Sequence, residues 1–420
     1  MEVKRGYKQT EVGVIPEDWG TPMLGEILMS MQLGGNYKNS ERQTKWPLIK
    51  MGNLGRGSMK LDKLEYVDIS QPPAVRDRLH FDDVLFNTRN TLDLVGKVAI
   101  WRNELAEAYF NSNIMRMGFD PARVSTSRFM NYILNTQNSI VGLHGIAIGT
   151  TSVAAIYSRD LVKLRIPLPT KIEQDAIAEA LSDADALIES LERLLTKKRQ
   201  IKQGAMQELL TGKKRLPGFS GEWETCRIQD VADVKTGPFG SSLHERDYVE
   251  DGTPIITVEH LGEFGVLHSN PPMVSDADRR RLGAYSLEEY DIVFSRVGSI
   301  DRNALIRSAE AGWLFSGRLL RLRLNDKYAF APYLSYQFHT EPFKQRVKSV
   351  AVGQTMASLS TQILNGIEVI LPTLAEQIAI ASVLSDMDSE LSALETKLAK
   401  ARQLKQGMMQ ELLTGRIRLV

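Results

Sequence analysis

The sequence contains a single cysteine, Cys226, among its 420 residues. One thiol excludes an intrachain disulfide and a zinc site built from several cysteines. The sequence also lacks any run of about 18 apolar residues, which a membrane-spanning helix needs, and its first residues lack the apolar stretch of a signal peptide. We therefore expect a cytoplasmic protein without disulfides.

An excess of either charge is also missing, because 52 lysines and arginines stand against 51 aspartates and glutamates. Proteins that bind DNA on their own usually carry a basic excess. Any contact with nucleic acid must therefore come from local basic groups or be shared with partner subunits.

Signatures of several enzyme classes are absent as well. There is no Gly-x-x-x-x-Gly-Lys-Ser/Thr phosphate loop, and no strand is followed by a Gly-x-Gly helix start. The six histidines are scattered without metal-ligand spacing. The segment Asn270-Pro-Pro-Met273 is close to the motif with which amino-methyltransferases hold a target amine, but methionine replaces the aromatic ring that would stack on a flipped base. We expect no catalytic residue, metal site or cofactor in this chain.

What the sequence does contain is one long segment that occurs twice. Residues 168–216 and 371–419 align at a constant offset of 203, and about 30 of the 49 paired positions are identical. A repeat of this length is too long for a solenoid. The chain is therefore a duplicated unit made of one domain and one long helix.

The repeated segment has the features of a long helix. Thr170 and Thr373 each precede a glutamate by three residues, as in a capping box, and Thr-Gly pairs mark the two helix ends. Each helix of about 38 residues would be about 57 Å long. Apolar residues recur with the 3-4 spacing of a coiled-coil seam. They are Leu181, Ala184, Leu187, Leu191, Leu194, Ile201, Ala205 and Leu209 in the first copy, and Leu384, Met387, Leu391, Leu394, Leu398, Ala401, Met408 and Leu412 in the second.

The segments between the helices have the pattern of mixed α/β domains. Helical spacing appears in 127–135 and 331–347. The predicted strands are 48–53, 84–88, 97–101, 114–118, 162–166, 255–258, 292–295, 304–307, 319–324 and 366–371. The predicted divisions are domain 1–167, helix 168–216, domain 217–370 and helix 371–420.

The two domains are weakly related to each other. Trp19 corresponds to Trp223, and Asp83-Val-Leu-Phe86 corresponds to Asp291-Ile-Val-Phe294. The lead-in to Trp223 follows the first helix, whereas the same lead-in is missing after the second helix and occurs instead at the N-terminus. We therefore expect both termini beside one helix end, with the two helices in an antiparallel coiled coil about a pseudo-two-fold axis.

Several motifs occur in the same order in both halves. They include tryptophan-led domain starts, Gly-x-Thr segments at 149–151 and 353–355, Leu-Pro-Thr-x-x-Glu-Gln, and Lys-Gln-Gly-x-Met-Gln-Glu-Leu-Leu-Thr-Gly; Lys235-Thr-Gly-Pro-Phe-Gly-Ser-Ser242 occurs in the second half. With these motifs the chain resembles, over essentially its whole length, the DNA-specificity (S) subunits of type I restriction–modification systems.

The resemblance implies two target-recognition domains, each reading one half of a split site in double-stranded DNA, with the helices setting the gap. It implies no catalysis in this chain. Its partners would be two methyltransferase subunits that use S-adenosylmethionine, and motor–nuclease subunits that use ATP and Mg²⁺. The alternative from another class is a coiled-coil scaffold whose domains bind proteins without DNA specificity.

Polar and basic residues in glycine-rich loops and at strand ends are the candidates for DNA contacts. The alternative for each is a solvated loop side chain, or one bonded to turn backbone. The candidates are Asn36, Lys38, Asn87, Arg89, Asn113, Thr150 and Thr151 in the first domain, and Lys235, Ser241, Ser242, His244, Arg296, Arg318, Gln354 and Thr355 in the second. Arg89 and Arg296 are favoured because they follow the paired strands.

Overall fold

The computed structural model of the chain describes residues 5–238, 243–262, 265–351 and 357–419. The chain divides into two compact units, Met1–Glu192 with Thr396–Val420, and Arg193–Glu395. Two long helices, α4 (Lys171–Leu209) and α10 (Leu374–Leu412), each belong partly to one unit and partly to the other. Each unit therefore contains one mixed α/β domain and one end of each long helix, as the duplication predicts.

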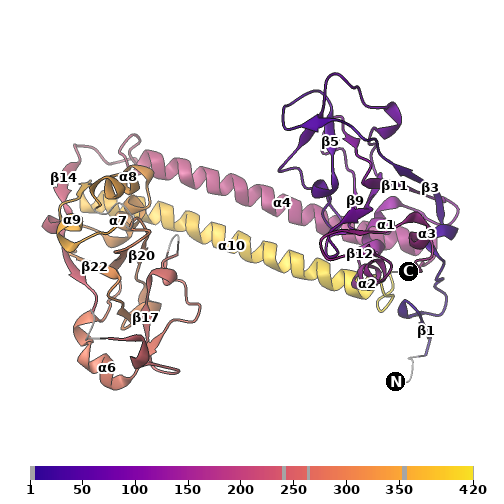
Figure 1. Ribbon diagram of the computed structural model, residues 1–420. Helices are drawn as coiled ribbons and strands as arrows, with labels where there is room; N and C mark the ends of the chain where they lie inside the picture. The colour runs from indigo at the N-terminus through magenta and orange to yellow at the C-terminus, as the bar shows by residue number, and fades with distance from the viewer. Residues whose placement is uncertain (1–4, 239–242, 263–264, 352–356, 420) are drawn as a thin grey trace. The chain divides into compact units, whose positions relative to one another are not determined.

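The first unit is built on an antiparallel sheet with the order β3-β11-β7-β9, against which helix α1 packs (Figure 1). A second sheet has the order β10-β5-β6-β4, and small sheets are formed by β12-β13-β8 and β1-β2. The bounds are β1 Tyr7–Thr10, β2 Gly13–Pro16, β3 Leu28–Leu33, β4 Asn39–Ser40, β5 Pro47–Ile49, β6 Glu65–Val67, β7 Val84–Asn87, β8 Arg89–Asn90, β9 Val98–Ile100, β10 Tyr109–Phe110, β11 Ile114–Phe119, β12 Ile148–Gly149, β13 Ala154–Ala155, α1 Ser127–Leu134, α2 Gln137–Gly145 and α3 Ser158–Leu161.

The second unit repeats this plan with the sheets β15-β22-β19-β20 and β16-β18-β17-β21, and adds the pair β14-β23. The bounds are β14 Glu224–Arg227, β15 Ala232–Thr236, β16 Tyr248–Val249, β17 Thr253–Ile256, β18 Met273–Val274, β19 Ile292–Ser295, β20 Asn303–Leu305, β21 Leu314–Phe315, β22 Leu319–Leu324, β23 Glu368–Leu371, α5 Ile228–Val231, α6 Asp276–Arg281, α7 Ala331–Phe338, α8 Glu341–Val350 and α9 Thr361–Asn365.

The central strands are buried on both faces. In β7, Val84 and Phe86 belong to the core that contains α1, whereas Leu85 belongs to a separate core against the second sheet. Successive side chains of a strand point to opposite faces, so an uninterrupted apolar run fits a sheet covered on both sides. In β19, Phe294 and Val293 divide between two cores in the same way.

Three predicted elements differ from the structure. The strand predicted over 48–53 ends at Ile49, and Met51–Asn53 form a short 3₁₀ helix. Residues 162–166 do not form a strand, although their counterpart β23 pairs with β14. The segment opposite them contains Pro22, which has no N–H to donate, and only isolated bridges form, such as Met23 with Arg165. The helix predicted over 331–347 is two helices, α7 and α8, because Pro342 at the start of α8 cannot continue the hydrogen bonding of α7.

The long helices begin and end where the sequence predicts. The hydroxyls of Thr170 and Thr373 accept hydrogen bonds, each of 3.4 Å, from the backbone N–H groups of Glu173 and Glu376. After the helices, Gly212 and Gly415 adopt φ values of 71° and 69°, a conformation that favours glycine. None of the described helices is both long enough and apolar enough to cross a bilayer.

In the first unit the beginning of α4 lies beside the end of α10. Lys405 pairs with Asp185 at 2.5 Å and Arg402 pairs with Glu192 at 2.6 Å. The later residue of one helix therefore meets the earlier residue of the other, so the two helices are antiparallel here.

The second unit shows the same antiparallel pairing for the other two helix ends. Lys198 pairs with Glu390 at 2.6 Å, and Lys202 pairs with Asp388. The Lys202 amine is almost fully buried, and its ring neighbour is Tyr336 at 5.5 Å. Lys202 and Lys405 are equivalent in the repeat, and so are Asp388 and Asp185.

The predicted seam is wrong for part of α4. Leu187, Leu194 and Ile201 are 51%, 39% and 47% exposed, whereas Leu195 and Lys202 are buried. The 3-4 spacing can be read on two neighbouring faces of this helix, and the packed face includes a lysine that an apolar pattern does not select. For α10, the predicted seam residues Leu384, Leu394, Leu398, Ala401 and Leu412 are buried.

A buried glutamate of one long helix lies beside each domain start and is bound by an arginine that follows the other long helix. In the first unit, Nε1 of Trp19 donates to Oε2 of Glu173 at 2.9 Å, and Arg418 donates to the same carboxylate at 2.8 Å. In the second unit, Arg215 donates two hydrogen bonds of 2.6 Å to Glu376, and its guanidinium lies 5.4 Å from the ring centroid of Trp223. The same three residue types thus lie together in the two units, although the indole N–H of Trp223, unlike that of Trp19, has no hydrogen-bond partner among the described residues.

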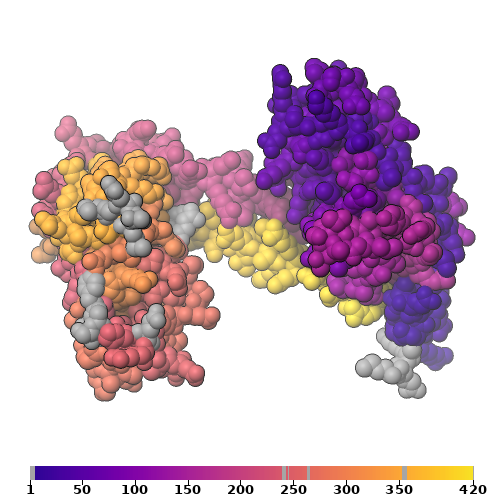
Figure 2. All heavy atoms as spheres, in the orientation of Figure 1, coloured from indigo at the N-terminus to yellow at the C-terminus, as the bar shows by residue number. Residues whose placement is uncertain are grey.

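The two chain ends meet in the first unit, as predicted. The hydroxyl of Tyr7 donates to the carbonyl of Gly415 at 2.9 Å, and Arg418 pairs with Asp18 at 2.9 Å. The N-terminal hairpin, in indigo, accordingly lies close to the end of α10, in yellow (Figures 1 and 2).

Candidate nucleic-acid interface

The directions of the central strands bring several loops to one edge of each sheet. Strand β11 is antiparallel to both β3 and β7. The ends of β3 and β7 and the beginning of β11 therefore lie at the same edge. In the second unit β22 is antiparallel to β15 and β19, so the corresponding loops share one edge there too.

Backbone hydrogen bonds hold these loops together in the first unit. The N–H of Thr88 donates to Asn113 at 3.0 Å, and the N–H of Leu92 donates to Thr151 at 3.1 Å. The segments that contain Arg89, Asn113 and Thr151 are therefore neighbours, although more than 20 residues separate each from the next along the chain.

A glycine allows the loop after the first strand to approach the turn before β11. A Cβ atom at Gly34 would lie 2.1 Å from the carbonyl oxygen of Phe110, and one at Gly237 would lie 2.1 Å from that of Ser316. Both distances are shorter than any non-bonded contact, so only glycine fits. This approach places the loop with Asn36 and Lys38 beside the three segments that contain Arg89, Asn113 and Thr151.

The second unit has the same connections. The N–H of Arg296 donates to the carbonyl of Arg318 at 2.8 Å, and the N–H of Gly298 donates to Ala357 at 3.1 Å. The segments that contain Arg296 and Arg318 are therefore neighbours at one edge, and Lys235 lies near the end of β15. Ser241, Ser242, Gln354 and Thr355 lie outside the described residues.

The predicted residues differ in their exposure. Arg89 is exposed, Asn113, Lys235 and Arg296 are partly buried, and Asn87 is fully buried. The others that the structure describes are all exposed: Asn36, Lys38, Thr150, Thr151, His244 and Arg318.

Several of the predicted side chains are engaged within the protein. Lys38 forms an ion pair with Asp68 at 3.8 Å, and the hydroxyl of Thr150 lies 3.1 Å from that of Ser152. Nδ2 of Asn87 donates to Leu94 at 3.3 Å, and its Oδ1 accepts from the N–H of Arg89 at 3.3 Å, so Asn87 orders the turn and does not face solvent. Nζ of Lys235 donates to the carbonyl of Ala284 at 2.8 Å.

Arg89 and Arg296 are not equivalent, contrary to the pairing used to favour them. Arg296 donates from its N–H to residue 318, just as Thr88 donates to residue 113. Arg296 therefore corresponds to Thr88, and Val297 corresponds to Arg89. Adjacent residues of an extended chain point to opposite sides, so the two arginines have different surroundings.

The sequence interpretation did not include three basic residues of the first unit beside this edge: Arg56, Lys60 and Lys97. The N–H of Asn87 donates to the carbonyl of Lys97 at 2.9 Å, and Nη2 of Arg56 donates to Asp93 at 3.5 Å. These side chains come from two separate segments, so no local sequence motif joins them.

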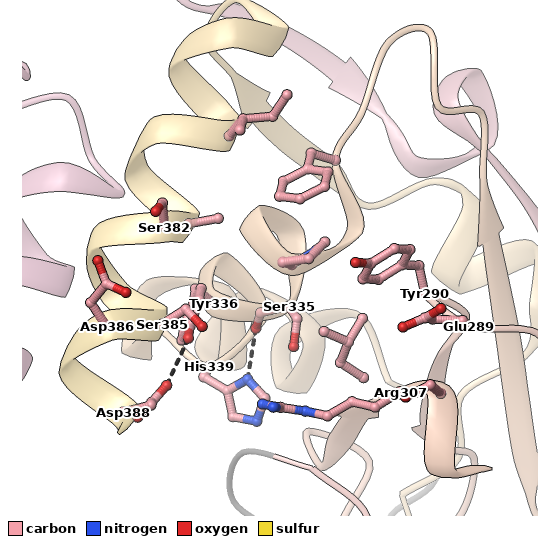
Figure 3. A pocket seen from close by; sticks show the side chains of 16 residues that line it. Glu289, Tyr290, Arg307, Ser335, Tyr336, His339, Ser382, Ser385, Asp386 and Asp388 are labelled. Carbon is pink, nitrogen blue, oxygen red and sulfur yellow. Dashed lines mark hydrogen bonds between the residues drawn. The ribbon is translucent and has the colours of Figure 1, made fainter. Parts of the chain in front are cut away.

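A cavity of about 450 Å³ lies in the second unit between α7 and the first part of α10 (Figure 3). Within its wall, Tyr336 donates to Asp388 at 2.7 Å, while the side chain of Arg307 extends toward the ring of His339. The cavity also contacts Leu305, which pairs with Ile292 at the beginning of β19. It therefore lies at the opposite edge of the sheet and is separate from the candidate interface.

Among the described residues, no group of three or more histidine, cysteine, aspartate or glutamate side chains is arranged to hold a metal ion. The candidate interface is instead a set of polar and basic loop side chains. Such a surface suits hydrogen bonding to base edges and phosphates.

Known proteins share this architecture. The family described as "Type I restriction modification DNA specificity domain" matches residues 16–203 and again residues 220–403. A type I restriction enzyme MjaX specificity subunit of Methanocaldococcus jannaschii is 25% identical, over 99% of this chain and 97% of that protein. The MjaIX specificity subunit of the same organism is 22% identical over 98% and 96% of the two chains.

Solved structures agree in fold. The crystal structure of a type I restriction–modification S subunit from M. genitalium superposes with a TM-score of 0.62 at 16% identity, over 98% of each chain. A chain from a study of complex assembly and conformational transition of a type I restriction–modification system has a TM-score of 0.54 at 17% identity, over 96% of this chain and 99% of that one. The chain belongs to the type I restriction–modification DNA-specificity family, as a non-catalytic specificity subunit with two DNA-recognition domains.

Proposed function

We propose that the loops at the sheet edge of each unit read one half of a bipartite site in double-stranded DNA. The observation that carries this proposal is the convergence of loops from separate parts of each domain at one edge of its sheet. Sequence-specific readers need several side chains at base edges, and phosphate contacts to set their register. The exposed residues Arg89 in the first unit and Arg318 in the second are our main candidates for base contacts.

The two half-sites should differ in sequence. The sheet frameworks of the two units are equivalent, but the side chains at the edge are not: Arg89 corresponds to Val297, and Asn113 to Arg318. A shared scaffold with divergent loops is the expected design for two readers of different bases. The recognised site is therefore asymmetric.

We assign residues 1–167 and 217–370 to the two target-recognition domains and residues 168–216 and 371–420 to the spacer helices. The antiparallel ion pairs in each unit support a coiled coil as the spacer. Coiled-coil packing resists bending, so it would convert helix length into a fixed gap between the half-sites.

The repeat also suggests how this chain binds its partners. The Arg418–Glu173–Trp19 and Arg215–Glu376–Trp223 clusters give each unit an equivalent helix junction. Two equivalent surfaces suit two identical methyltransferase subunits on a chain whose DNA site is asymmetric. We assign S-adenosylmethionine to those subunits, and ATP and Mg²⁺ to motor–nuclease subunits of the full complex. All would act in the cytoplasm, where host DNA is found.

Nuclease footprinting tests this function. The full chain, assembled with its methyltransferase, should protect two short blocks of the methylated host motif, about one helical turn apart. Protection should be lost on a duplex with one altered block. Uniform protection, or none, would support the alternative of a scaffold that binds proteins without DNA specificity.

A further inference from the structure

Three basic residues form a compact group in the first unit, beside the candidate interface. Arg56 and Lys60 belong to the connection between β5 and β6 of the second sheet, and Lys97 precedes β9. Arg56 and Lys60 are exposed, and Lys97 is partly buried. None of the three is among the residues that we assigned to base contacts.

The turn that carries Arg56 and Lys60 is held firmly. Gly57 has a φ of 88°, which favours glycine, and its N–H donates to the carbonyl of Val98 at 2.7 Å. The side chain of Asn131, on α1, donates to the carbonyl of Gly57 at 2.9 Å. The backbone is thus fixed to β9 on one side and to α1 on the other, so the basic side chains start from defined positions.

The three side chains approach one another. Gly57 forms a bridge with Ala99, which brings Arg56 beside the segment that begins at Lys97. A Cβ atom at Gly55 would lie 3.5 Å from Cε of Lys60, so the lysine stem folds back over the turn toward Arg56.

The group is electrostatically uncompensated. Burial, and then the nearby charges of Lys60 and Arg56, lower the pKa of Lys97. In the described part of the chain, no carboxylate forms an ion pair with any of the three. A bound anion would reduce the repulsion between like charges that are held together without a counter-charge.

The group also adjoins the interface directly. Arg56 donates to the carbonyl of Asp93, and the neighbouring Leu92 donates to Thr151 in the turn between β12 and β13. Lys97 accepts from Asn87 at the end of β7. An anion bound here would therefore lie next to DNA that occupies the sheet edge.

The second unit does not repeat this group. Arg302 corresponds to Lys97, because its carbonyl accepts a hydrogen bond from Ser295 just as that of Lys97 accepts one from Asn87. The guanidinium of Arg302, however, donates to the carbonyl of Leu261. Leu267 takes the position of Lys60. The position of Arg56 is Glu263 in the sequence and lies outside the described residues.

We propose that Arg56, Lys60 and Lys97 form a DNA phosphate-binding site that anchors the backbone beside the half-site of the first unit. This proposal rests on the proposed function, since the anion is the backbone of the DNA being read. Such contacts carry no base information but set register and affinity. The anchoring is asymmetric: the first unit holds the backbone by this group, and the second unit does not.

The test is the salt dependence of DNA binding by the full chain with its methyltransferase. The probes are a duplex with the methylated host motif and a mixed-sequence duplex. Log affinity falls as log salt concentration rises. Replacing all three residues (Arg56→Gln, Lys60→Gln, Lys97→Gln) should make this slope less steep by about 2 to 3, because each lost phosphate contact contributes about 0.9. The affinity for both duplexes should fall by the same factor, and the sequence that the complex methylates should not change.

A matched control removes three charges at the opposite edge of the same sheet: Arg123→Gln, Arg159→Gln and Lys163→Gln. These side chains are all exposed and should leave the slope unchanged. Equal slopes for the two triple variants, with circular dichroism showing both folded, would overturn the proposal. If the unaltered complex shows no preference for the host motif, the proposed function itself fails instead.

Discussion

Arg418 donates from Nη2 to Oε2 of Glu173 at 2.8 Å, although 245 positions separate the two residues in the chain. Glu173 is fully buried, and Arg215 holds the equally buried Glu376 in the same way in the second unit. Arg418 therefore neutralises the buried glutamate beside the first domain, just as Arg215, in the segment before Trp223, neutralises the one beside the second.

Removing this arginine should destabilise the first unit. The change Arg418→Met leaves the buried Glu173 carboxylate without its counter-charge, which we expect to cost about 3 kcal/mol, the lower end for a buried pair, because Arg418 is 31% exposed. Urea unfolding measures the cost. Arg416→Met, at an exposed site nearby, should change stability by less than about 0.5 kcal/mol. Equal midpoints for the two variants would contradict the role of the cluster.

The stability that Tyr132 provides should disappear at high pH. Burial, and then the charge of Asp185, raise the pKa of Tyr132 to about 12, and its hydroxyl donates to Asp185 at 2.7 Å. A raised folded-state pKa means that this stability is complete below about pH 10, the unfolded value, and is lost as pH rises through about 12. The difference in unfolding free energy between the wild type and Tyr132→Phe should shrink across this window. The same change at exposed Tyr328 should give a small difference at every pH; a constant difference for Tyr132 would refute the assignment.

Single arginines at the two sheet edges should each affect one half-site. Arg89→Gln should relax base preference at a position of one half, and Arg318→Gln at a position of the other, each by about 1 to 3 kcal/mol of discrimination. Methylation of a randomised-site library measures both, and each variant serves as the control for the other. Loss of preference in the same half for both variants would contradict two separate readers.

Exchange of a whole domain should likewise affect only one half-site. Replacing residues 1–167 with the corresponding domain of another family member should alter one half-site and leave the other half and the gap unchanged. Sequencing of methylated adenines in cells that express the chimera provides the measurement. A change in both halves together would show that the domains do not read independently.

Lengthening the helices should lengthen the gap. Because ion pairs match α4 to α10 in both units, one heptad must be added to each helix, near residues 190–200 and at the matching place in α10. Each heptad adds about 10 Å, or about three base pairs of DNA. Both half-sites should be retained while the methylated motif gains these base pairs. A heptad added to α4 alone should instead unfold the junctions, and an unchanged gap in the matched variant would rule out the spacer role.

Much of the fold could be predicted because its signals are local. The repeat, the threonine caps and Gly212 and Gly415 define the long helices within one or two residues. Strands 292–295 and 319–324 match their predicted ranges, since apolar runs of that length between turns fit a sheet that is buried on both faces. The failures at 162–166 and 331–347 involve Pro22 and Pro342, whose effects depend on hydrogen-bond partners elsewhere.

The candidate interface was predictable in outline only. Glycine-rich loops at strand ends indicated segments that do meet at the sheet edge, such as those of Arg89, Asn113 and Thr151. Asn87, however, faces inward, and Arg296 aligns with Thr88, because a shift of one residue along a strand reverses the side of the chain. The basic group of Arg56, Lys60 and Lys97 was not predictable, since a parallel bridge between Gly57 and Ala99 creates it.

Duplication, helix lengths and family membership could thus be read from residue order alone, because they depend on periodicity and on identities repeated at a constant offset. Three features required the folded chain: the face of α4 that packs, the burial of Lys202 against Asp388, and the charges that gather beside the sheet edge. Each of these depends on contacts between residues far apart in sequence, and no local pattern encodes which distant side chain will be the neighbour.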